Sequence, residues 1–278
     1  MARRRSVRDL LHFRPGKGLL TLADIDPGAT PGIRKRTARR QQLADQEKLM
    51  QLQERLYAEG TRSVLLVLQG MDTSGKGGSI SHVIGAVDPQ GVRITGFKAP
   101  TAEELSHDFL WRIRKALPLP REIGIFNRSH YEDVLIVRVK DLVPEAVWSK
   151  RYNEINRFER EVTRSGTTIV KICLHISFDE QRKRLISRLM DPTKRWKFNP
   201  RDLEERARWA DYQVAYDAAL FRCSTVTAPW YVVPADKKWY RNWAITRILI
   251  ETLSELDPQY PESDLDVPAL MERLASTE

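Results

Sequence analysis

Residues 63–69 read SVLLVLQ, and the glycine-rich sequence GMDTSGKGG follows directly. A run of apolar residues bounded by polar ones is typical of a strand buried on both faces, as in a parallel sheet. Gly70, Gly75 and Lys76 fit the pattern G-x-x-x-x-G-K, in which backbone N–H groups at a helix N-terminus bind phosphate. This segment therefore predicts a strand, a phosphate-binding loop and a helix in immediate succession. The alternative is a strand-to-helix turn that simply requires glycines.

One position departs from that pattern. Gly77 stands where a Ser or Thr normally provides a hydroxyl for Mg²⁺. Asp72 is the preferred replacement, because a carboxylate in an anion-binding loop repels phosphate unless a cation lies between them. Ser79, two residues late, is the alternative. The residues expected to surround a phosphate are Thr73, Ser74, Gly75, Gly77 and Gly78.

The rest of the chain alternates between strand-like and helix-like segments. Strands are expected near 92–97 and at 122–126, 167–177 and 230–235, and helices over 34–59, 76–86, 102–117, 143–165, 178–190 and 237–256. This order predicts an α/β fold with a parallel five-stranded sheet flanked by helices.

Composition divides the chain into three parts. Residues 1–33 are rich in Arg, Gly and Pro and are expected to form an extended basic arm. Residues 34–256 form the predicted α/β domain, and residues 257–278 a C-terminal tail.

The net charge of +9 over 278 residues favours a polyanionic partner: nucleic acid, an anionic membrane or a phosphate-rich substrate. No apolar stretch has the length of a membrane span, and the N-terminus lacks the apolar core of a secretory signal. Cys173 and Cys223 are the two cysteines, which does not indicate a disulfide framework. A cytoplasmic location is expected.

A second group of candidate residues follows the predicted third strand, in IGIFNRSHYEDV. Asn127, Arg128 and Glu132 would lie at the carboxyl edge of the sheet, where open α/β sheets bind ligands. Arg128 is suited to compensating negative charge on a transferred phosphoryl group, and Glu132 to holding a metal or an acceptor. His130 allows a rival mechanism with a phosphohistidine intermediate.

Basic residues with interleaved aromatic residues crowd the stretch 182–212. Arg188, Lys194, Arg195 and Lys197 belong to it, together with Trp196 and Trp209. In a kinase of this topology the same place holds a lid that closes positive charge over the phosphates. Stacking on nucleic-acid bases is the alternative explanation.

In combination, four motifs resemble the polyphosphate kinase 2 family over roughly residues 30–256. They are GMDTSGKGG, FKAPTAEELSHDFLWR, GIFNRSHYEDV and DPTKRWKF with RWADY. The resemblance implies a P-loop kinase core with a lid, and phosphoryl transfer between inorganic polyphosphate and nucleotides with Mg²⁺ or Mn²⁺. It also implies a homo-oligomer, a dimer or tetramer, for which the helix over 34–59 is a candidate interface.

Carried over by position, Asp72 and Lys76 correspond to the loop residues needed for transfer, and Arg128 to the Arg after the third strand. The cations from Arg188 to Lys197 correspond to the lid. Asn127 stands where much of the family has Asp, and the chain looks like the subgroup with FNRSHYED, which is associated with accepting nucleoside mono- and diphosphates. In that subgroup Glu132 is the compensating carboxylate, and with Asp72 it is the expected metal ligand.

If polyphosphate occupies the phosphate-binding loop, the nucleotide binds on the acceptor side. The expected acceptor-site residues are Lys98, Asp108 and Arg112, and the nucleotides are ADP and ATP, with AMP and guanine nucleotides as further candidates. Two other hypotheses stay open: an ATP-dependent kinase of nucleoside monophosphates or small metabolites, and a nucleic-acid-binding protein. A nucleic-acid-binding protein would have no use for the carboxylates of Asp72 and Glu132, so nucleic acid is not an expected partner. A membrane is not an expected partner either.

Overall fold

The central strand β1 (Ser63–Gln69) is buried along its whole length and pairs in parallel with β3 on one side and β4 on the other. The computed structural model describes residues 5–16 and 21–276. The sheet has the strand order β2-β3-β1-β4-β5, and all four pairings are parallel. The other strands are β2 (Val92–Gly96), β3 (Ile123–Asn127), β4 (Thr167–His175) and β5 (Trp230–Pro234). The predicted five-stranded parallel α/β sheet is confirmed.

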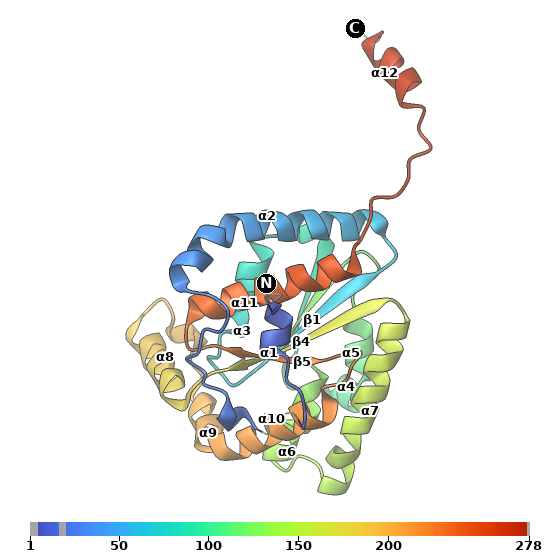
Figure 1. Ribbon diagram of the computed structural model, residues 1–278. Helices are drawn as coiled ribbons and strands as arrows, with labels where there is room; N and C mark the ends of the chain where they lie inside the picture. Colours follow the sequence, from blue (N-terminus) through green and yellow to red (C-terminus); the bar gives the residue numbers. More distant parts are fainter. Residues whose placement is uncertain (1–4, 17–20, 277–278) are drawn as a thin grey trace.

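Helices cover both faces of the sheet (Figure 1). The described helices of four or more residues are α1 (Val7–Leu11), α2 (Lys35–Glu59), α3 (Lys76–Ile84), α4 (Ala102–Leu105), α5 (Trp111–Ala116), α6 (Ile136–Val139), α7 (Glu145–Arg164), α8 (Phe178–Met190), α9 (Arg201–Ala207), α10 (Trp209–Cys223), α11 (Lys238–Leu256) and α12 (Val267–Ala275). Short 3₁₀ turns lie at η1 (Leu22–Asp24), η2 (Pro89–Gly91), η3 (His130–Val134) and η4 (Arg195–Lys197).

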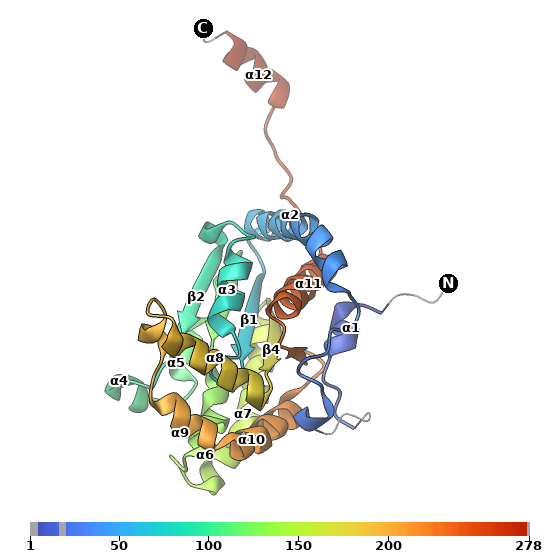
Figure 2. The ribbon, with the colours of Figure 1, turned by 90° about the vertical axis from the view of Figure 1, so that its left-hand side faces the viewer.

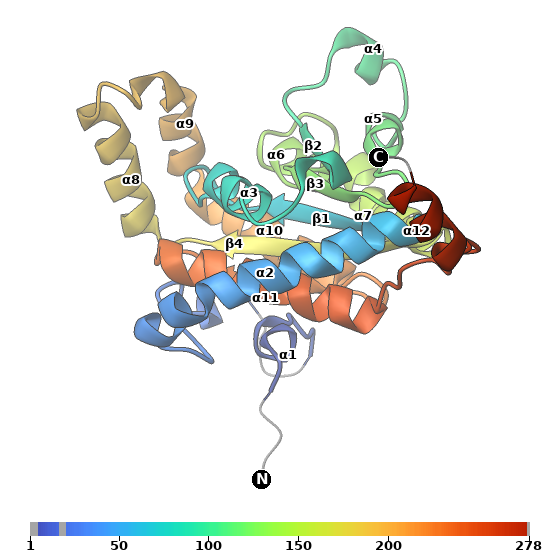
Figure 3. The same ribbon diagram turned by 90° about the horizontal axis from the view of Figure 1, so that it is seen from above.

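The alternation of side chains along β1 divides the core into two layers. Leu65 and Val67 belong to the cluster formed with α7 and α10, whereas Val64, Leu66 and Leu68 belong to the cluster formed with α2, α3 and α11. In Figure 3, α2 and α11 run side by side across the second of these faces. Because both faces are covered, β1 can be apolar at every position from 64 to 68.

The expected helix over 102–117 is wrong, because the segment forms two short helices. Ser106 ends α4: its hydroxyl donates to the carbonyl of Glu103 at 2.7 Å. Asp108 then starts the next turn, since its carboxylate accepts the N–H of Leu110 at 3.0 Å. Short polar side chains that bond their own backbone compete with helix continuation. The helical α10 was also not predicted from the sequence.

The N-terminal segment 1–33 was expected to be an extended arm, but its described part packs onto the sheet edge. The helix α1 contacts α11 and β5, and Phe13 is 1% exposed. The N–H of Phe13 donates to the carbonyl of Trp230 at 2.8 Å, and its own carbonyl accepts from the hydroxyl of Ser224 at 2.8 Å. The arm thus extends the core beyond β5.

The C-terminal tail ends in α12, which stands apart from the rest of the molecule (Figure 2). None of the residues of α12 is buried. The helices of the described segments include none that is both long and apolar enough to span a bilayer.

The packing of Phe13 leads to a prediction about stability. Replacing Phe13 by Ala is expected to lower the free energy of unfolding by about 3–5 kcal/mol, because a buried aromatic ring is lost and a cavity remains. Phe221→Ala is the matched control: Phe221 is 54% exposed, so a change within about 0.5 kcal/mol is expected. Denaturant titration of the three proteins measures both. Equal effects of the two substitutions would contradict the packing of the arm.

Candidate active site

The phosphate-binding loop, residues 70–76, joins β1 to α3 at the carboxyl edge of the sheet. Three of its residues have positive φ: Gly70 at 149°, Thr73 at 64° and Gly75 at 111°. A Cβ atom on Gly75 would lie 1.7 Å from Nη1 of Arg241, and one on Gly70 would lie 2.7 Å from the carbonyl oxygen of Leu174. Both glycines are therefore required by close contacts as well as by backbone conformation.

The loop presents several polar groups to the carboxyl edge. Gly77 and Gly78 lie in the first turn of α3, where backbone N–H groups have no intrahelical acceptor. The N–H of Ser74, by contrast, donates to the carbonyl of Met71 at 3.1 Å. Within the described part of the chain, the buried hydroxyl oxygens of Thr73 and Ser74 have no hydrogen-bond partner. Of the residues expected to surround a phosphate, Ser74 therefore has its N–H already engaged, while the hydroxyls of Thr73 and Ser74 are without a partner in the described part of the chain.

The carboxylate of Asp72 lies against Arg128. Nη2 of Arg128 donates to Oδ1 of Asp72 at 2.8 Å, which joins the loop after β1 to the end of β3. The pairing of Leu68 with Asn127 sets this proximity, and Arg128 has a φ of 65° that directs its side chain away from the regular strand. The two residues that the sequence singled out from separate motifs therefore form one pair.

Charges around this pair set its protonation. Burial tends to raise the pKa of Asp72, but Lys76 and Arg128 outweigh it, so the pKa lies below the usual value of an aspartate. Burial lowers the pKa of Lys76, with the attraction of Asp72 opposing the shift. Its ammonium group donates to the carbonyls of Gly70 at 2.6 Å and Met71 at 3.3 Å. Asp72 is thus held as a carboxylate within electrostatic reach of two cations.

Glu132 lies on η3, immediately after the pair. Its Oε1 accepts from Nε2 of Gln69 at 3.0 Å, so the last residue of β1 holds it. Asn127 ends β3, and its carbonyl accepts the N–H of Phe97 at 3.0 Å. Glu132 also acts electrostatically on Lys76 and Arg128. The structure therefore brings all five expected catalytic residues to neighbouring loops at one edge of the sheet.

The oxygen atoms at this edge are suitable for a hard divalent cation. Asp72 and Glu132 supply carboxylates, and Oε1 of Gln69 is buried without a partner among the residues that the structure describes. Ser79, the alternative to Asp72, is 0% exposed, and its hydroxyl donates to the carbonyl of Gly75 at 3.1 Å within α3. Within the described ranges no group of three or more His, Cys, Asp or Glu side chains has the arrangement of a metal site. A cation here would need phosphate or water oxygens besides the two carboxylates.

Two arginines support the loop; the sequence analysis counted Arg184 only among the basic residues of the stretch 182–212 and did not single out Arg241. Arg184 of α8 donates to the carbonyls of Thr73 and Ser74 at 3.0 and 3.1 Å, and to those of Ala235 and Asp236 at 2.7 and 2.8 Å. Arg241 of α11 is 4% exposed and donates to the carbonyl of Ser74 at 3.4 Å. No sequence pattern predicts these contacts, because the loop and the two helices that support it are far apart along the chain.

The basic residues of the predicted lid lie on α8 and the turn that follows it. Arg188 acts electrostatically on Asp72 and contacts Asp202 at 3.6 Å. Lys194, Arg195 and Lys197 are exposed and keep their polar contacts within the lid itself, for example Lys194 with Asp191 at 2.5 Å. In Figure 3, α8 and α9 project from the carboxyl edge, separate from the sheet. The structure thus brings Arg188 toward the phosphate-binding loop and leaves the other three cations at the tip.

The expected acceptor residues separate into two groups. Lys98 and Arg112 line a cavity of about 670 Å³ beside β2, and Arg112 donates to the carbonyl of Lys98 at 2.9 Å. Asp108 is not among the residues that line it; its carboxylate accepts the N–H of Leu110 at the start of α5. Asp108 therefore positions the helix that carries Arg112.

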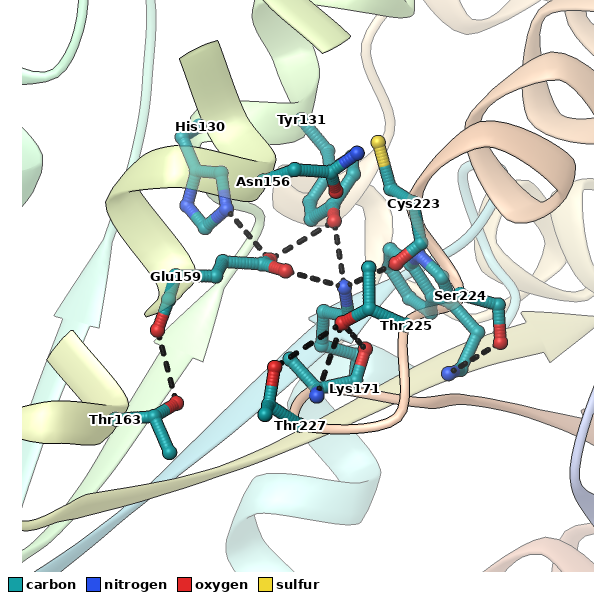
Figure 4. A network of polar contacts seen from close by, with 12 residues as sticks. His130, Tyr131, Asn156, Glu159, Thr163, Lys171, Cys223, Ser224, Thr225 and Thr227 are labelled. Carbon is teal, nitrogen blue, oxygen red and sulfur yellow. Dashed lines mark hydrogen bonds and ion pairs between the residues drawn. The ribbon is translucent and has the colours of Figure 1, made fainter. Parts of the chain in front are cut away.

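A buried polar network includes His130 and Tyr131, which lie between Arg128 and Glu132 in the sequence (Figure 4). Lys171 is 0% exposed and donates to Oε2 of Glu159 at 2.6 Å and to the hydroxyl of Tyr131 at 2.7 Å. Oε1 of Glu159 accepts from Tyr131 at 2.8 Å and lies 3.2 Å from Nε2 of His130. His130 is 0% exposed and its Nε2 faces Glu159, so a phosphoryl donor does not reach the ring in this structure, which argues against the phosphohistidine mechanism considered from the sequence.

Comparison with known proteins agrees with this geometry. The family model described as Polyphosphate kinase 2 matches residues 32–261. An AMP/ADP-polyphosphate phosphotransferase of Meiothermus ruber is 56% identical over 217 residues, which cover 78% of this chain and 81% of that one. An ADP-polyphosphate phosphotransferase of Rhodopseudomonas palustris is 45% identical over 229 residues, covering 78% and 79% of the two chains.

A solved structure is similar throughout. The crystal structure of polyphosphate kinase 2 from Arthrobacter aurescens TC1 superposes with a TM-score of 0.94 at 48% identity, covering 100% of this chain and 99% of that chain. A family match over most of the sequence, two relatives well above 30% identity and a full-length structural match lead to one conclusion. The chain belongs to the polyphosphate kinase 2 family.

Proposed function

We propose that the chain transfers a phosphoryl group between inorganic polyphosphate and nucleotides, and that it accepts both ADP and AMP. One observation carries this proposal: Asp72 and Lys76 of the phosphate-binding loop meet Arg128 and Glu132 at one edge of the sheet. The basic helix α8 of the lid lies next to them. The names of the relatives from Meiothermus ruber and Rhodopseudomonas palustris support the substrate class. The sequence FNRSHYED supports acceptance of the monophosphate.

The transfer is direct and in line. A terminal oxygen of the nucleotide phosphate attacks the terminal phosphorus of polyphosphate. The bond from that phosphorus to its bridging oxygen breaks, and the shortened polyphosphate leaves with the electron pair. Lys76 and Arg128 compensate the negative charge that spreads over the transferred group, and the loop N–H groups fix its position.

Asp72 and Glu132 are the residues that would hold Mg²⁺ or Mn²⁺, together with the free Oε1 of Gln69. A bound divalent ion neutralises charge on phosphate oxygens. Arg128 keeps the carboxylate of Asp72 ionised and correctly oriented for that role. Asn127 lies at the end of β3 beside the pair, so no second carboxylate crowds Asp72 from that position.

Polyphosphate and nucleotide approach from different sides. Thr73, Ser74, Gly75, Gly77 and Gly78 surround the terminal phosphate of the donor, and its chain continues past Arg188 to the exposed cations Lys194, Arg195 and Lys197 of the lid. The acceptor nucleotide occupies the cavity beside β2, where Lys98 and Arg112 meet its phosphates. Two further expectations stay predictions: assembly into a dimer or tetramer, and a cytoplasmic location.

The first test is a transfer assay with defined substrates. Purified protein with Mg²⁺ and long-chain polyphosphate is expected to form ATP from ADP, and ADP followed by ATP from AMP, as measured by chromatography of the nucleotides. Asp72→Asn and Lys76→Ala are each expected to lower kcat by about 100-fold or more, because charge compensation at the transferred group is lost.

Asp264→Asn is the matched control for charge, since Asp264 is exposed in the C-terminal tail and lies outside the site. Its kcat should equal that of the unaltered protein. Phosphorylation of an acceptor by ATP alone, with no transfer from polyphosphate, would contradict the donor assignment. ATP formation from ADP but not from AMP would contradict only the subgroup assignment.

The buried network positions Arg128 and Glu132, and this role is testable without leaving a buried charge unpaired. Glu159→Leu with Lys171→Met removes both charges and the acceptor for Tyr131 and His130. We expect kcat to fall roughly tenfold or more, since small displacements of reacting groups are costly, while the KM for polyphosphate changes less than about threefold. Glu159→Gln with Lys171→Met restores the acceptor oxygen and should recover most of kcat.

Ser63→Ala with Thr167→Val provides the control for a lost buried contact. Ser63 and Thr167 share a buried hydrogen bond of 2.9 Å at the opposite end of β1. This variant should keep its kcat. Equal kcat in the Leu/Met and Gln/Met variants would show that the network contributes stability only.

The same network makes stability depend on pH. Burial lowers the pKa of His130, with Glu159 opposing the shift, so the folded protein keeps this imidazole neutral below its usual pKa of about 6.5. The unfolded chain takes up that proton, and stability therefore decreases as pH falls through 6.5. His130→Gln is expected to reduce the slope between pH 6 and 5 by up to about 1.4 kcal/mol per pH unit.

Denaturant titrations at several pH values measure these slopes. His107→Gln is the control, because His107 is exposed and stacks on Trp111 at a centroid distance of 4.0 Å. The His107 variant should retain the slope of the unaltered protein. If His130→Gln retains it as well, His130 does not remain neutral in the folded state.

A further inference from the structure

Gln181 is a buried polar residue at the base of the lid. It lies in the first turn of α8 and is 1% exposed. Both ends of its amide group have a partner: Nε2 donates to the main-chain carbonyl of Asp72 at 3.1 Å, and Oε1 accepts from Nη1 of Arg206 at 2.9 Å. Asp72 belongs to the phosphate-binding loop and Arg206 to α9. One side chain therefore joins the loop to the returning helix of the lid.

The two partners of Gln181 favour an amide between them. A carbonyl can only accept a hydrogen bond and a guanidinium group can only donate one, so the residue between them must donate at one end and accept at the other. A carboxylate cannot donate, and an ammonium group cannot accept. An apolar side chain would leave both partners unpaired, which costs free energy in a buried place.

Gln181 also sets the direction of a loop N–H group. The carbonyl of Asp72 and the N–H of Thr73 belong to one peptide group, and the described chain contains no cis peptide bond. In a trans peptide these two groups point in opposite directions. Holding the carbonyl toward α8 therefore directs the N–H of Thr73 away from α8. Thr73 is one of the residues expected to surround the donor phosphate.

This part of the loop needs support from outside. Thr73 has a φ of 64°, a left-handed conformation that is unfavourable for a β-branched residue. Such conformations persist where the surrounding contacts impose them. Arg184, one turn further along α8, donates to the next two carbonyls, those of Thr73 and Ser74, at 3.0 and 3.1 Å. Gln181 and Arg184 thus hold three consecutive loop carbonyls against α8.

Arg206 is fixed to the start of α8. Its Nη1 also donates to the carbonyl of Phe178 at 2.6 Å, and its guanidinium carbon lies 3.3 Å from the centre of the Phe178 ring. The same ring packs edge to face on Trp209, with 5.2 Å between the centroids. These contacts hold α9 against the base of α8. The two helices are the arms of the lid in Figure 3, and the exposed cations of the tip lie on the chain between them.

We propose that Gln181 is a positioning residue for phosphoryl transfer. It sets the peptide group between Asp72 and Thr73, and Arg206 makes that setting depend on the packing of α9. This role rests on the proposed function, in which the loop holds the donor phosphate. Asp72 is then held twice, by Arg128 at its carboxylate and by Gln181 at its carbonyl. Because Gln181 is buried away from both substrates, its loss affects the transfer step more than binding.

Steady-state transfer from polyphosphate to ADP tests this role. Gln181→Met keeps the length of the side chain and removes both hydrogen bonds, whereas Gln181→Glu keeps the acceptor for Arg206 and loses the donor to Asp72. Both variants are expected to lower kcat about tenfold, because small displacements of reacting groups are costly, and to change the KM for polyphosphate less than about threefold.

Gln53→Met is the matched control. Gln53 is also 1% exposed, and its amide also bonds a main chain in both directions: it accepts the N–H of Asp88 at 3.2 Å and donates to the carbonyl of Asp88 at 3.5 Å. Asp88 precedes η2 and belongs to neither the phosphate-binding loop nor the lid. This variant loses the same kind of contact and should keep its kcat.

A double variant tests the link to the lid. Arg206→Met alone is expected to lower kcat about threefold or more, since the loop loses its connection to α9. If Arg206 acts through Gln181, adding Arg206→Met to Gln181→Met should lower kcat no further. Two effects that multiply would contradict the chain of contacts from α9 to the loop.

Hydrogen–deuterium exchange gives a readout that does not depend on activity. The amides of residues 70–76 should exchange faster in Gln181→Met than in the unaltered protein, and should not change in Gln53→Met. Absence of transfer from polyphosphate in the unaltered protein would contradict the proposed function alone. Unchanged exchange of the loop in Gln181→Met would overturn the role of Gln181 even then.

Three kinetic results would also overturn it. The first is an unchanged kcat in Gln181→Met, which would leave Gln181 a contribution to stability only. The second is a full kcat in Gln181→Glu, which would limit Gln181 to bracing α9. The third is a lower kcat in Gln181→Glu but not in Gln181→Met, which would be an effect of the added charge.

Discussion

The parallel pairing of β1 with β3 is the constraint on which the site depends. Because Leu68 lies opposite Asn127, the two strands end together, and the next residues of each chain segment turn into one space. Asp72 and Arg128 reach each other at 2.8 Å from that starting point. A shift of one residue in this register would move the side chains of β3 to the other face and would separate the pair. The chemistry of the site is therefore a consequence of how the sheet is registered.

The loop between β1 and α3 is held by two helices in addition to its own hydrogen bonds. Ser74 is contacted from two helices, because Arg184 and Arg241 both donate to its carbonyl. Burial, and then the repulsion of Arg184, lower the pKa of Arg241 to about 10, so it remains a cation at neutral pH. Two cations placed behind the loop add positive potential at the point where the N-terminus of α3 already favours an anion. The same side chains that fix the loop thus also favour its ligand.

The sequence was sufficient for features that depend on local pattern and insufficient for those that depend on contacts between distant segments. Apolar runs at 64–68 and 167–177 predicted buried strands, and the glycine spacing predicted the loop that joins β1 to α3. The break between α4 and α5 was missed, since side-chain bonds of Ser106 and Asp108 override the apolar periodicity of that stretch. The supports Arg184 and Arg241, and the pairing of Lys171 with Glu159, were also missed. A lysine inside a predicted strand reads as a solvated residue unless its buried partner is known.

The lid shows why a polyanionic donor suits this protein. Its tip carries Lys194, Arg195 and Lys197 in solvent, where, among the residues that the structure describes, Asp191 alone forms an ion pair with one of them. Exposed cations of this kind are screened and contribute little to the stability of the fold. They gain strong interactions only when a chain of phosphates spans the distance to the phosphate-binding loop, and Arg188 lies along that route, within electrostatic reach of Asp72. In the proposed arrangement, a single nucleotide bound at the loop would reach Arg188 and leave the tip without a phosphate, whereas a long polyphosphate would span both.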